Sequence, residues 1–354
     1  MDTIRADDNA VSNDSAGSAV AIATTDLILG IDFGGTKVAI GIADMSGEVL
    51  VQHRLETDAM AGAIQAVDRT MAAASGLLDA YLPDWPGRLA AIGVVSPGIV
   101  LPDQILLAPN VPGWEQLRLR ERVAARFATI PTAVGTDAKA AALAEWRWGA
   151  LAGADPGVFL TVGTGLAAAI LIGGRVIPGA NGASGEIGYN LRGVTDHGGY
   201  AAGSASLEEA VAGRGLGARA SALLGRPSTA AELFTLADRD PAARTLLADA
   251  LDELAVHVAN LAIAIDPARI AVGGGLTASA DVLLPALRGR LAQAVPFPPE
   301  LVTARFDQDG ALRGAIALAL DELGIGSAVT SAVTSAVVPG TREGTELDAS
   351  CRPR

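Results

Sequence analysis

Short apolar runs, separated by glycine or polar turns, open the chain. They predict three consecutive strands at 27–31, 38–43 and 49–54. In 63–81 the apolar residues instead recur every three or four positions, which predicts a helix, and the apolar run 91–95 predicts a buried strand. The first part of the chain therefore has the predicted order βββαβ.

The same order returns in the second half of the chain. Strands predicted at 158–162 and 167–172 enclose a glycine turn, and a third strand follows at 175–177. The other predicted elements are strands at 132–134, 269–272 and 302–305 and helices at 115–127, 137–148, 207–211, 230–237, 241–265, 280–294 and 310–323. Two βββαβα halves that face each other are typical of the two-lobed α/β fold of actin-like (ribonuclease-H-like) ATPases.

We expect two lobes and two tails, because a chain of 354 residues is too long for one small core. The small lobe is expected to span 27–135, joined by the helix at 310–323, and the large lobe to span 136–309. The segments 1–26 and 324–354 are expected to be disordered. The first mixes Asp, Asn, Ser and Ala, and the second repeats Ser-Ala-Val-Thr before it turns polar.

Composition argues against several classes of function. A net charge of −13 does not suit a general nucleic-acid binder, which needs a basic face. No apolar run approaches the ~18 residues of a membrane-spanning helix. The N-terminus lacks the basic start of a secretory signal, so we expect a cytoplasmic protein with no membrane partner. Cys351 is the only cysteine, which leaves no intrachain disulfide and no cysteine zinc site.

One glycine turn near the N-terminus contains candidate functional residues. Asp32 lies at the end of the strand before this turn. The turn and the start of the return strand contain Gly34, Gly35, Thr36 and Lys37. Glycines allow backbone N–H groups to approach an anion closely, while a hydroxyl and an ammonium add a donor and a positive charge. Asp32 can hold Mg²⁺, usually through its water shell. The turn suits the phosphates of a nucleotide, although its spacing is not that of a Walker P-loop. The alternative is a plain glycine hairpin with an incidental acid.

Six motifs resemble, in order and spacing, those of the ROK family of sugar kinases and repressors. They lie at 32–37, 110–114, 137–143, 163–165, 185–188 and 273–275. Each motif alone is a weak signal, and together they are specific. The resemblance covers 27–323 and implies a glucokinase-like enzyme that uses ATP and Mg²⁺ to phosphorylate a hydroxyl of a hexose or modified hexose. The family also implies O6 as the phosphorylated atom and a homodimer.

The resemblance assigns roles to individual residues. Asp137 matches the family's catalytic base, because a sugar hydroxyl must lose its proton to a carboxylate as it attacks the γ-phosphate. Glu186 and Glu208 match carboxylates that bind sugar hydroxyls, and Asn110 resembles a further sugar contact. The nucleotide and its outer phosphates are expected at Gly163, Thr164, Gly165, Gly273, Gly274 and Gly275.

Each of these assignments has a structural alternative. Asp137 is also a good helix N-cap residue. Glu208 is also an acid in the first turn of a predicted helix, where the helix dipole favours it. The glycines at 273–275 also suit a simple turn between a strand and a helix.

The chain departs from the family pattern around the expected sugar site. Thr136 stands where asparagine is usual, and Tyr189 where the family has a histidine that touches sugar and binds zinc. Both are candidate sugar contacts. The stretch 192–208 has no cysteine, and His197 alone cannot complete a tetrahedral site, so we expect no zinc.

Two further departures concern the phosphate turn and a lysine. Ala167 and Ala168 follow a turn that is usually richer in glycine, which leaves the phosphate affinity open. Lys139 replaces a common asparagine and is, with Lys37, one of only two lysines in the chain. For Lys139 we favour a solvated helix position over a functional role.

Two non-enzymatic functions compete with a kinase. ROK repressors carry a winged helix-turn-helix ahead of the kinase-like region, whereas the 26 residues before the first predicted strand show no helical apolar pattern and no basic face. A non-catalytic sugar sensor is the other alternative. The presence of Asp32, Lys37 and Asp137 together argues against it.

Overall fold

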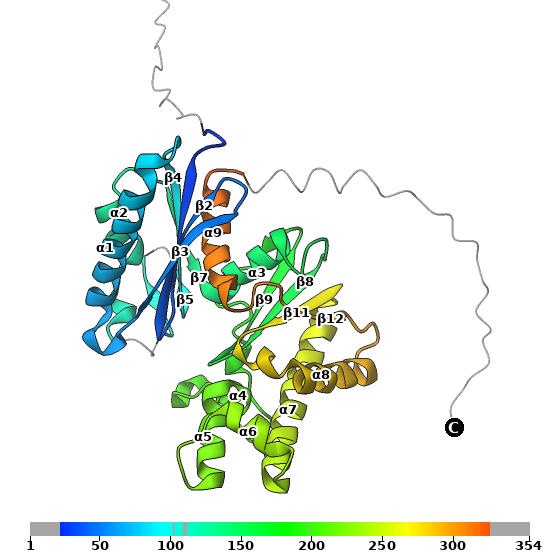
Figure 1. Cartoon of the computed structure of the whole chain (residues 1–354). Helices are drawn as coiled ribbons and strands as arrows, with labels where there is room; N and C mark the ends of the chain where they lie inside the picture. The colour runs from blue at the N-terminus through cyan, green and yellow to red at the C-terminus, as the bar shows by residue number, and fades with distance from the viewer. Residues whose placement is uncertain (1–21, 102, 109–111, 198, 326–354) are drawn as a thin grey trace, which may run out of the picture.

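The computed structural model describes residues 22–101, 103–108, 112–197 and 199–325, and two five-stranded sheets form the centres of two lobes (Figure 1). The first sheet has the strand order β3-β2-β1-β4-β7. Its strands are β1 (Leu27–Phe33), β2 (Lys37–Asp44), β3 (Val49–Glu56), β4 (Leu89–Ser96) and β7 (Thr132–Thr136). The central strands β1 and β4 are buried at nearly every position, as expected for strands covered on both faces.

The second sheet repeats the first, with the order β10-β9-β8-β11-β12. Its strands are β8 (Gly157–Val162), β9 (Leu166–Ile172), β10 (Arg175–Val176), β11 (Arg269–Gly273) and β12 (Glu300–Thr303). In both sheets the first strand pairs antiparallel with the second and parallel with the fourth. The predicted duplication is therefore confirmed.

Helices cover the outer faces of both sheets. In the first lobe these are α1 (Ala63–Tyr81) and α2 (Leu119–Arg126), which pack on the core of β1, β2 and β4. The helices of the second lobe are α4 (Ser206–Val211), α5 (Gly213–Leu224), α6 (Ala230–Ala237), α7 (Pro241–Ile265) and α8 (Ala280–Ala294). Among the described residues, none of the helices is both long and apolar enough to cross a membrane.

The two remaining helices lie between the sheets, and each packs on the sheet that it does not follow in sequence (Figure 1). The helix α3 (Asp137–Trp148) leaves the first sheet, but its Ala141 and Ala142 pack on the second sheet. The helix α9 (Gly310–Glu322) follows the second sheet and packs on the first, where a Cβ at Gly93 of β4 would lie only 1.7 Å from a backbone oxygen of α9.

The helices α3 and α9 also touch each other through their backbones. A Cβ at Gly314 would lie 2.2 Å from the carbonyl carbon of Ala140. Only glycine at this point allows the two helices to approach so closely. The catalytic candidate Asp137 lies one turn before Ala140, so this contact helps to fix its position.

One predicted helix boundary was wrong, and one helix was missed. The helix predicted at 115–127 begins only at Leu119, after a 3₁₀ turn at Trp114–Gln116. The cause is Trp114, whose buried ring packs edge-on against Phe33 and whose Nε1 donates to Ser96 Oγ at 2.6 Å. The helix α5 was not predicted, because three glycines in its first five residues suggest a loop.

The predicted tails fall mainly on residues 1–21 and 326–354, which lie outside the described residues. Residues 22–26, assigned to the N-terminal tail, contact the first lobe. Trp85 Nε1 donates to the carbonyl of Thr25 at 2.5 Å, and Arg88 forms an ion pair with the buried Asp26 at 3.5 Å.

Candidate active site

The turn between β1 and β2 is held in a fixed shape. Gly34 N–H donates to the carbonyl of Lys37 at 2.9 Å, and a Cβ at Gly34 would lie 2.6 Å from that oxygen. Thr57, at the end of β3, donates its hydroxyl to the carbonyl of Gly34 at 2.6 Å and its N–H to that of Thr36 at 2.9 Å. Thr57 was not singled out in the sequence. Its only signal is its position directly after the strand that pairs with β2.

The turn at Gly163–Gly165 occupies the equivalent place in the second sheet, between β8 and β9. Gly163 N–H donates to the carbonyl of Gly165 at 2.9 Å. The outward carbonyls of Gly163 and Thr164 accept from the N–H groups of Gly213 and Arg214, at 2.7 and 3.3 Å. The N-terminus of α5 is thereby attached to this turn.

The three glycines after β11 lie against the same turn. Gly274 has a φ of 91°, and a Cβ there would lie 2.7 Å from the carbonyl carbon of Val162. A Cβ at Gly163 would approach the backbone N of Gly275 to 3.3 Å. The glycines therefore do more than join a strand to a helix, because they allow two backbone segments to meet at the edge of a cavity.

That cavity has a volume of about 530 Å³ and lies between α5, α6 and the two glycine segments. Its lining includes Gly163, Thr164, Arg214, Phe234 and Gly275. The size is within the range of about 300–1,000 Å³ that small-molecule sites usually have. A cavity that the glycine turns border suits a nucleotide, whose phosphates can approach their backbone N–H groups.

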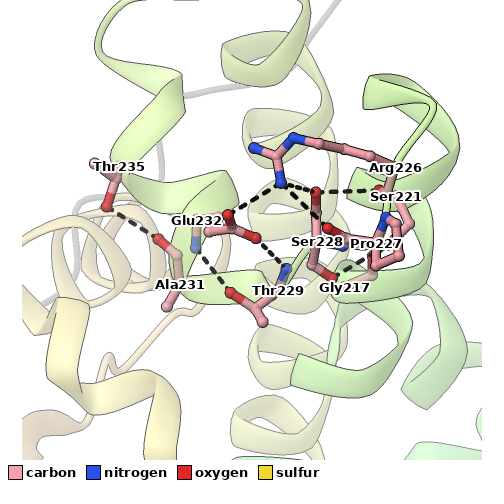
Figure 2. A network of polar contacts seen from close by, with 9 residues as sticks. All are labelled: Gly217, Ser221, Arg226, Pro227, Ser228, Thr229, Ala231, Glu232 and Thr235. Carbon is pink, nitrogen blue, oxygen red and sulfur yellow. Dashed lines mark hydrogen bonds and ion pairs between the residues drawn. The ribbon is translucent and has the colours of Figure 1, made fainter.

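One wall of this cavity is fixed by a polar network between α5 and α6 (Figure 2). The hydroxyl of Thr229 accepts from Glu232 N–H while Glu232 accepts from Thr229 N–H, which is a capping box at the start of α6. Arg226 contacts both Ser228 and Glu232, and Ser221 joins the loop to α5. These contacts fix the loop between α5 and α6 that forms the wall.

Four carboxylates form a chain of mutual electrostatic interactions across the site. Burial, and then the charge of Asp137, raises the pKa of Asp32 to about 7, while Arg54 opposes this. Burial raises the pKa of Asp137 to about 6, and Glu186 adds to this. Burial also raises the pKa of Glu186, to which Glu208 contributes. Negative charge is therefore concentrated beside the β1–β2 turn, which suits a divalent cation at Asp32.

Asp137 is the first residue of α3, and the N-cap position belongs to Thr136. The carboxylate accepts a 2.7 Å hydrogen bond from the N–H of Ala138. Its alternative role as an ordinary helix N-cap is therefore not what the structure shows. The hydroxyl of Thr136 accepts from the N–H of Val100 at 3.2 Å, which holds the short hairpin of β5 (Ile99–Val100) and β6 (Ile105–Leu106).

The two expected sugar carboxylates each have a basic partner. Lys139 Nζ lies 3.4 Å from Glu186 Oε1, and the side chains are only 13% and 22% exposed. The interpretation of Lys139 as a solvated helix residue is therefore wrong. Glu208, in the first turn of α4, accepts from the N–H of Leu166 at 3.0 Å and from Arg214 at 3.3 Å. It is thus fixed beside the Gly163–Gly165 turn.

Tyr189 lies beside these carboxylates. Burial, and then the charges of Glu208 and Glu186, raises the pKa of its phenol. Its ring packs edge-on against Tyr200, with 5.8 Å between the ring centroids. Asn110, the other expected sugar contact, lies outside the described residues.

The loop after Tyr189 is attached to α7 by polar contacts. Arg192 forms a bidentate ion pair with Glu253, in which Nη2 lies 2.9 Å from Oε2. The side-chain amide nitrogen of Asn190 lies 3.3 Å from Nδ1 of His257. In the part of the chain that the structure describes, no group of three or more His, Cys, Asp or Glu side chains is arranged to hold a metal ion.

We predict that folding and activity require no zinc, because these contacts fix the loop that cysteines would otherwise hold. Elemental analysis of the purified protein should find no stoichiometric zinc. EDTA should abolish activity without unfolding the protein, and Mg²⁺ alone should restore it, since the phosphates still need a hard cation. Unfolding by EDTA, or recovery only with added zinc, would contradict the prediction.

The duplicated sheets, the paired glycine turns and the carboxylates beside them define a protein of the actin-like ATPase fold, as the sequence predicted. The chain belongs to the ROK family, whose sequence profile matches residues 28–322.

Named relatives agree with this assignment. The chain is 33% identical to a glucokinase of Streptomyces coelicolor over 74% of this chain and 86% of that enzyme. It is 30% identical to a kanosamine kinase of Amycolatopsis mediterranei, over 82% of this chain and 95% of that one. A ROK family glucokinase from Streptomyces griseus, solved with glucose and AMPPNP, superposes with a TM-score of 0.64 at 29% identity and covers 83% of this chain and 99% of its own. These similarities confirm the expected class, an ATP-dependent sugar kinase.

Proposed function

We propose that the chain transfers the γ-phosphoryl group of ATP to a hydroxyl, O6, of a hexose or modified hexose. The observation that carries the proposal is the place of Asp137. It interacts electrostatically both with Asp32, which ends the strand before the phosphate turn, and with Glu186, an expected sugar ligand. A base at this point lies between a phosphate site and a set of carboxylates that suit sugar hydroxyls.

Asp137 accepts the proton of the attacking hydroxyl. Burial raises the pKa of this carboxylate to about 6, which makes it a stronger base than an exposed aspartate while it stays mainly ionised at pH 7. The N–H of Ala138 donates to one oxygen of this carboxylate and thereby orients it. Since the protein forms no covalent bond in this reaction, its remaining work is to position the reactants and stabilise charge.

The two glycine turns bind the phosphates, and the cavity of about 530 Å³ beside Gly275 binds the rest of the nucleotide. Gly34, Gly35, Thr36 and the exposed Lys37 act from the first lobe, and Gly163, Thr164 and Gly165 from the second. Asp32 holds Mg²⁺ through water, and the ion, when bound, neutralises phosphate charge.

The sugar lies against Glu186, Glu208 and Tyr189, with Asn110 as a further contact. Carboxylates accept two hydroxyl protons each, and a phenol both donates and accepts. Thr136 gives the sugar more room than an asparagine would, and its hydroxyl, which accepts from the N–H of Val100, keeps its own proton to donate. We also propose a cytoplasmic homodimer that does not bind nucleic acid.

An ADP-release assay over a panel of sugars tests the activity. Turnover that requires both a sugar and Mg²⁺ supports the proposal. A protein that binds sugar without turnover is a sensor, and one that binds a DNA duplex in a sugar-dependent manner is a regulator. Either result would replace the kinase assignment.

We predict that the pocket accepts a hexose modified around C1 to C3, an amino sugar or a glucoside, at least as well as glucose. Tyr189 offers an apolar ring face and a hydroxyl where the family commonly has histidine. Values of kcat/KM should be compared for glucose, free and N-acetylated amino sugars, and β-glucosides. A preference for glucose above about 100-fold would contradict the idea. If a modified sugar is preferred, Tyr189→Phe should reduce its kcat/KM more than that of glucose.

A further inference from the structure

Lys139 brings a positive charge to the expected sugar site beside Glu186, as Arg214 does beside Glu208. The charge of Glu186 acts on Asp137, and the charge of Glu208 acts on Glu186. Lys139 follows Asp137 by two residues in α3, and its side chain crosses to Glu186 on the loop that also carries Tyr189. Its Nζ and the Oε1 of Glu186 are 3.4 Å apart.

The contact between Lys139 and Glu186 is shielded from water. With 13% and 22% of the two side chains exposed, it differs from the surface ion pairs of this chain, such as Arg118–Glu121 at 64% and 65%. A shielded pair is screened less by solvent and salt, so removal of one partner leaves a charge that the surroundings stabilise poorly. Lys139 is therefore placed to affect the charge that a sugar meets in the pocket.

The charge of a sugar should affect how well it binds, because the pair of Lys139 and Glu186 is shielded from water. A neutral hexose needs Glu186 only as a hydrogen-bond acceptor. A free amino sugar carries an ammonium group at neutral pH, which Glu186 would attract and Lys139 would repel. With Lys139 present, one oxygen of Glu186 already contacts a cation, so an ammonium group gains little from that carboxylate.

We propose that Lys139 is a positioning and specificity residue, which holds Glu186 in place as a sugar acceptor and makes the pocket favour neutral over cationic sugars. The proposal rests on the sugar kinase function proposed above. It refines the substrate class, because it separates neutral modified hexoses, such as N-acetylated sugars and glucosides, from free amino sugars.

The test compares Lys139→Met, which keeps the length and removes the charge, with Lys139→Arg, which keeps the charge. Values of kcat and KM are measured for glucose, glucosamine and N-acetylglucosamine. In Lys139→Met, kcat/KM for glucose should fall, mainly through KM. The ratio of kcat/KM for glucosamine to that for glucose should rise about tenfold, while the ratio for N-acetylglucosamine should not. Lys139→Arg should retain the wild-type ratios.

Arg118→Met is the control, since it removes an exposed ion pair on α2 and should change none of the ratios. If Lys139→Met does not fold, Lys139→Gln carries the same expectation, because it keeps a donor toward Glu186 without the charge. An unchanged glucosamine ratio in an active, folded charge-removing variant overturns the proposal, as does a changed ratio in Lys139→Arg. Absence of sugar turnover in the wild type would instead refute the proposed function.

Discussion

Replacement of Asp137 by asparagine should lower kcat by about 10²–10⁴-fold while sugar binding changes much less. The substitution keeps the size of the side chain and one oxygen for the N–H of Ala138, but it removes the proton acceptor. Steady-state kinetics with the best sugar of the panel give kcat, and calorimetric titration of that sugar gives the binding constant. A variant within a few-fold of the wild type would show that another group takes the proton.

The pH profile supplies a second test of Asp137. Burial raises the pKa of this carboxyl to about 6, and only the ionised form accepts a proton. With Mg²⁺ and ATP saturating, so that Asp32 stays ionised beside the cation, the wild-type kcat/KM for the sugar should be maintained above about pH 6 and fall as the pH drops through that value. The residual rate of Asp137→Asn should lack this limb. Asp68→Asn, on the exposed surface of α1, is the matched control and should keep both the rate and the limb.

Replacement of Gly314 by alanine should lower the free energy of unfolding by about 2–3 kcal/mol. The added methyl group would lie 2.2 Å from the carbonyl carbon of Ala140, so α3 and α9 must separate. Because Asp137 begins α3, kcat should also fall, by about 10- to 100-fold. Urea denaturation and steady-state kinetics measure the two effects.

Gly289 in α8 offers the matched control, since a Cβ there meets no atom within 4 Å. There the same substitution should raise the free energy of unfolding by about 0.5–1 kcal/mol, because alanine favours helix. A decrease in the free energy of unfolding at Gly314, together with an increase at Gly289, would support the role of the α3–α9 contact. Equal effects would mean that helix propensity, rather than the contact with Ala140, decides the result at Gly314.

The sequence predicted most of the fold because its signals are local. The apolar runs of β1 and β4 and the helical spacing in Ala63–Tyr81 are properties of neighbouring residues. The start of α5 was missed for the opposite reason. Its glycine at 213 is required by a distant contact, since a Cβ there would lie 2.8 Å from the carbonyl oxygen of Gly163. A segment whose composition indicates a loop thus forms a helix, and this helix packs tightly against the Gly163–Gly165 turn.

The candidate site was also only partly predictable from the sequence. The glycine turns and Asp137 follow from motifs in one segment, whereas the role of Lys139 depends on Glu186, 47 residues further along the chain. Thr57 likewise acts on the β1–β2 turn from the end of a neighbouring strand. A single sequence does not reveal such pairs, because nothing in either segment identifies its partner.

The backbone contact between Gly314 and Ala140 has a consequence for motion. The helix α9 packs on the first sheet and α3 on the second, although each follows the other sheet in sequence. Separation of the lobes would therefore expose both interfaces. The close approach at Gly314, which faces the carbonyl group of Ala140, opposes sliding of one helix along the other. We therefore expect the lobes to move by a rotation of one against the other, with its pivot at this crossing. Asp137, one turn from the pivot, would then keep its place while the glycine turns further away swing together around the nucleotide.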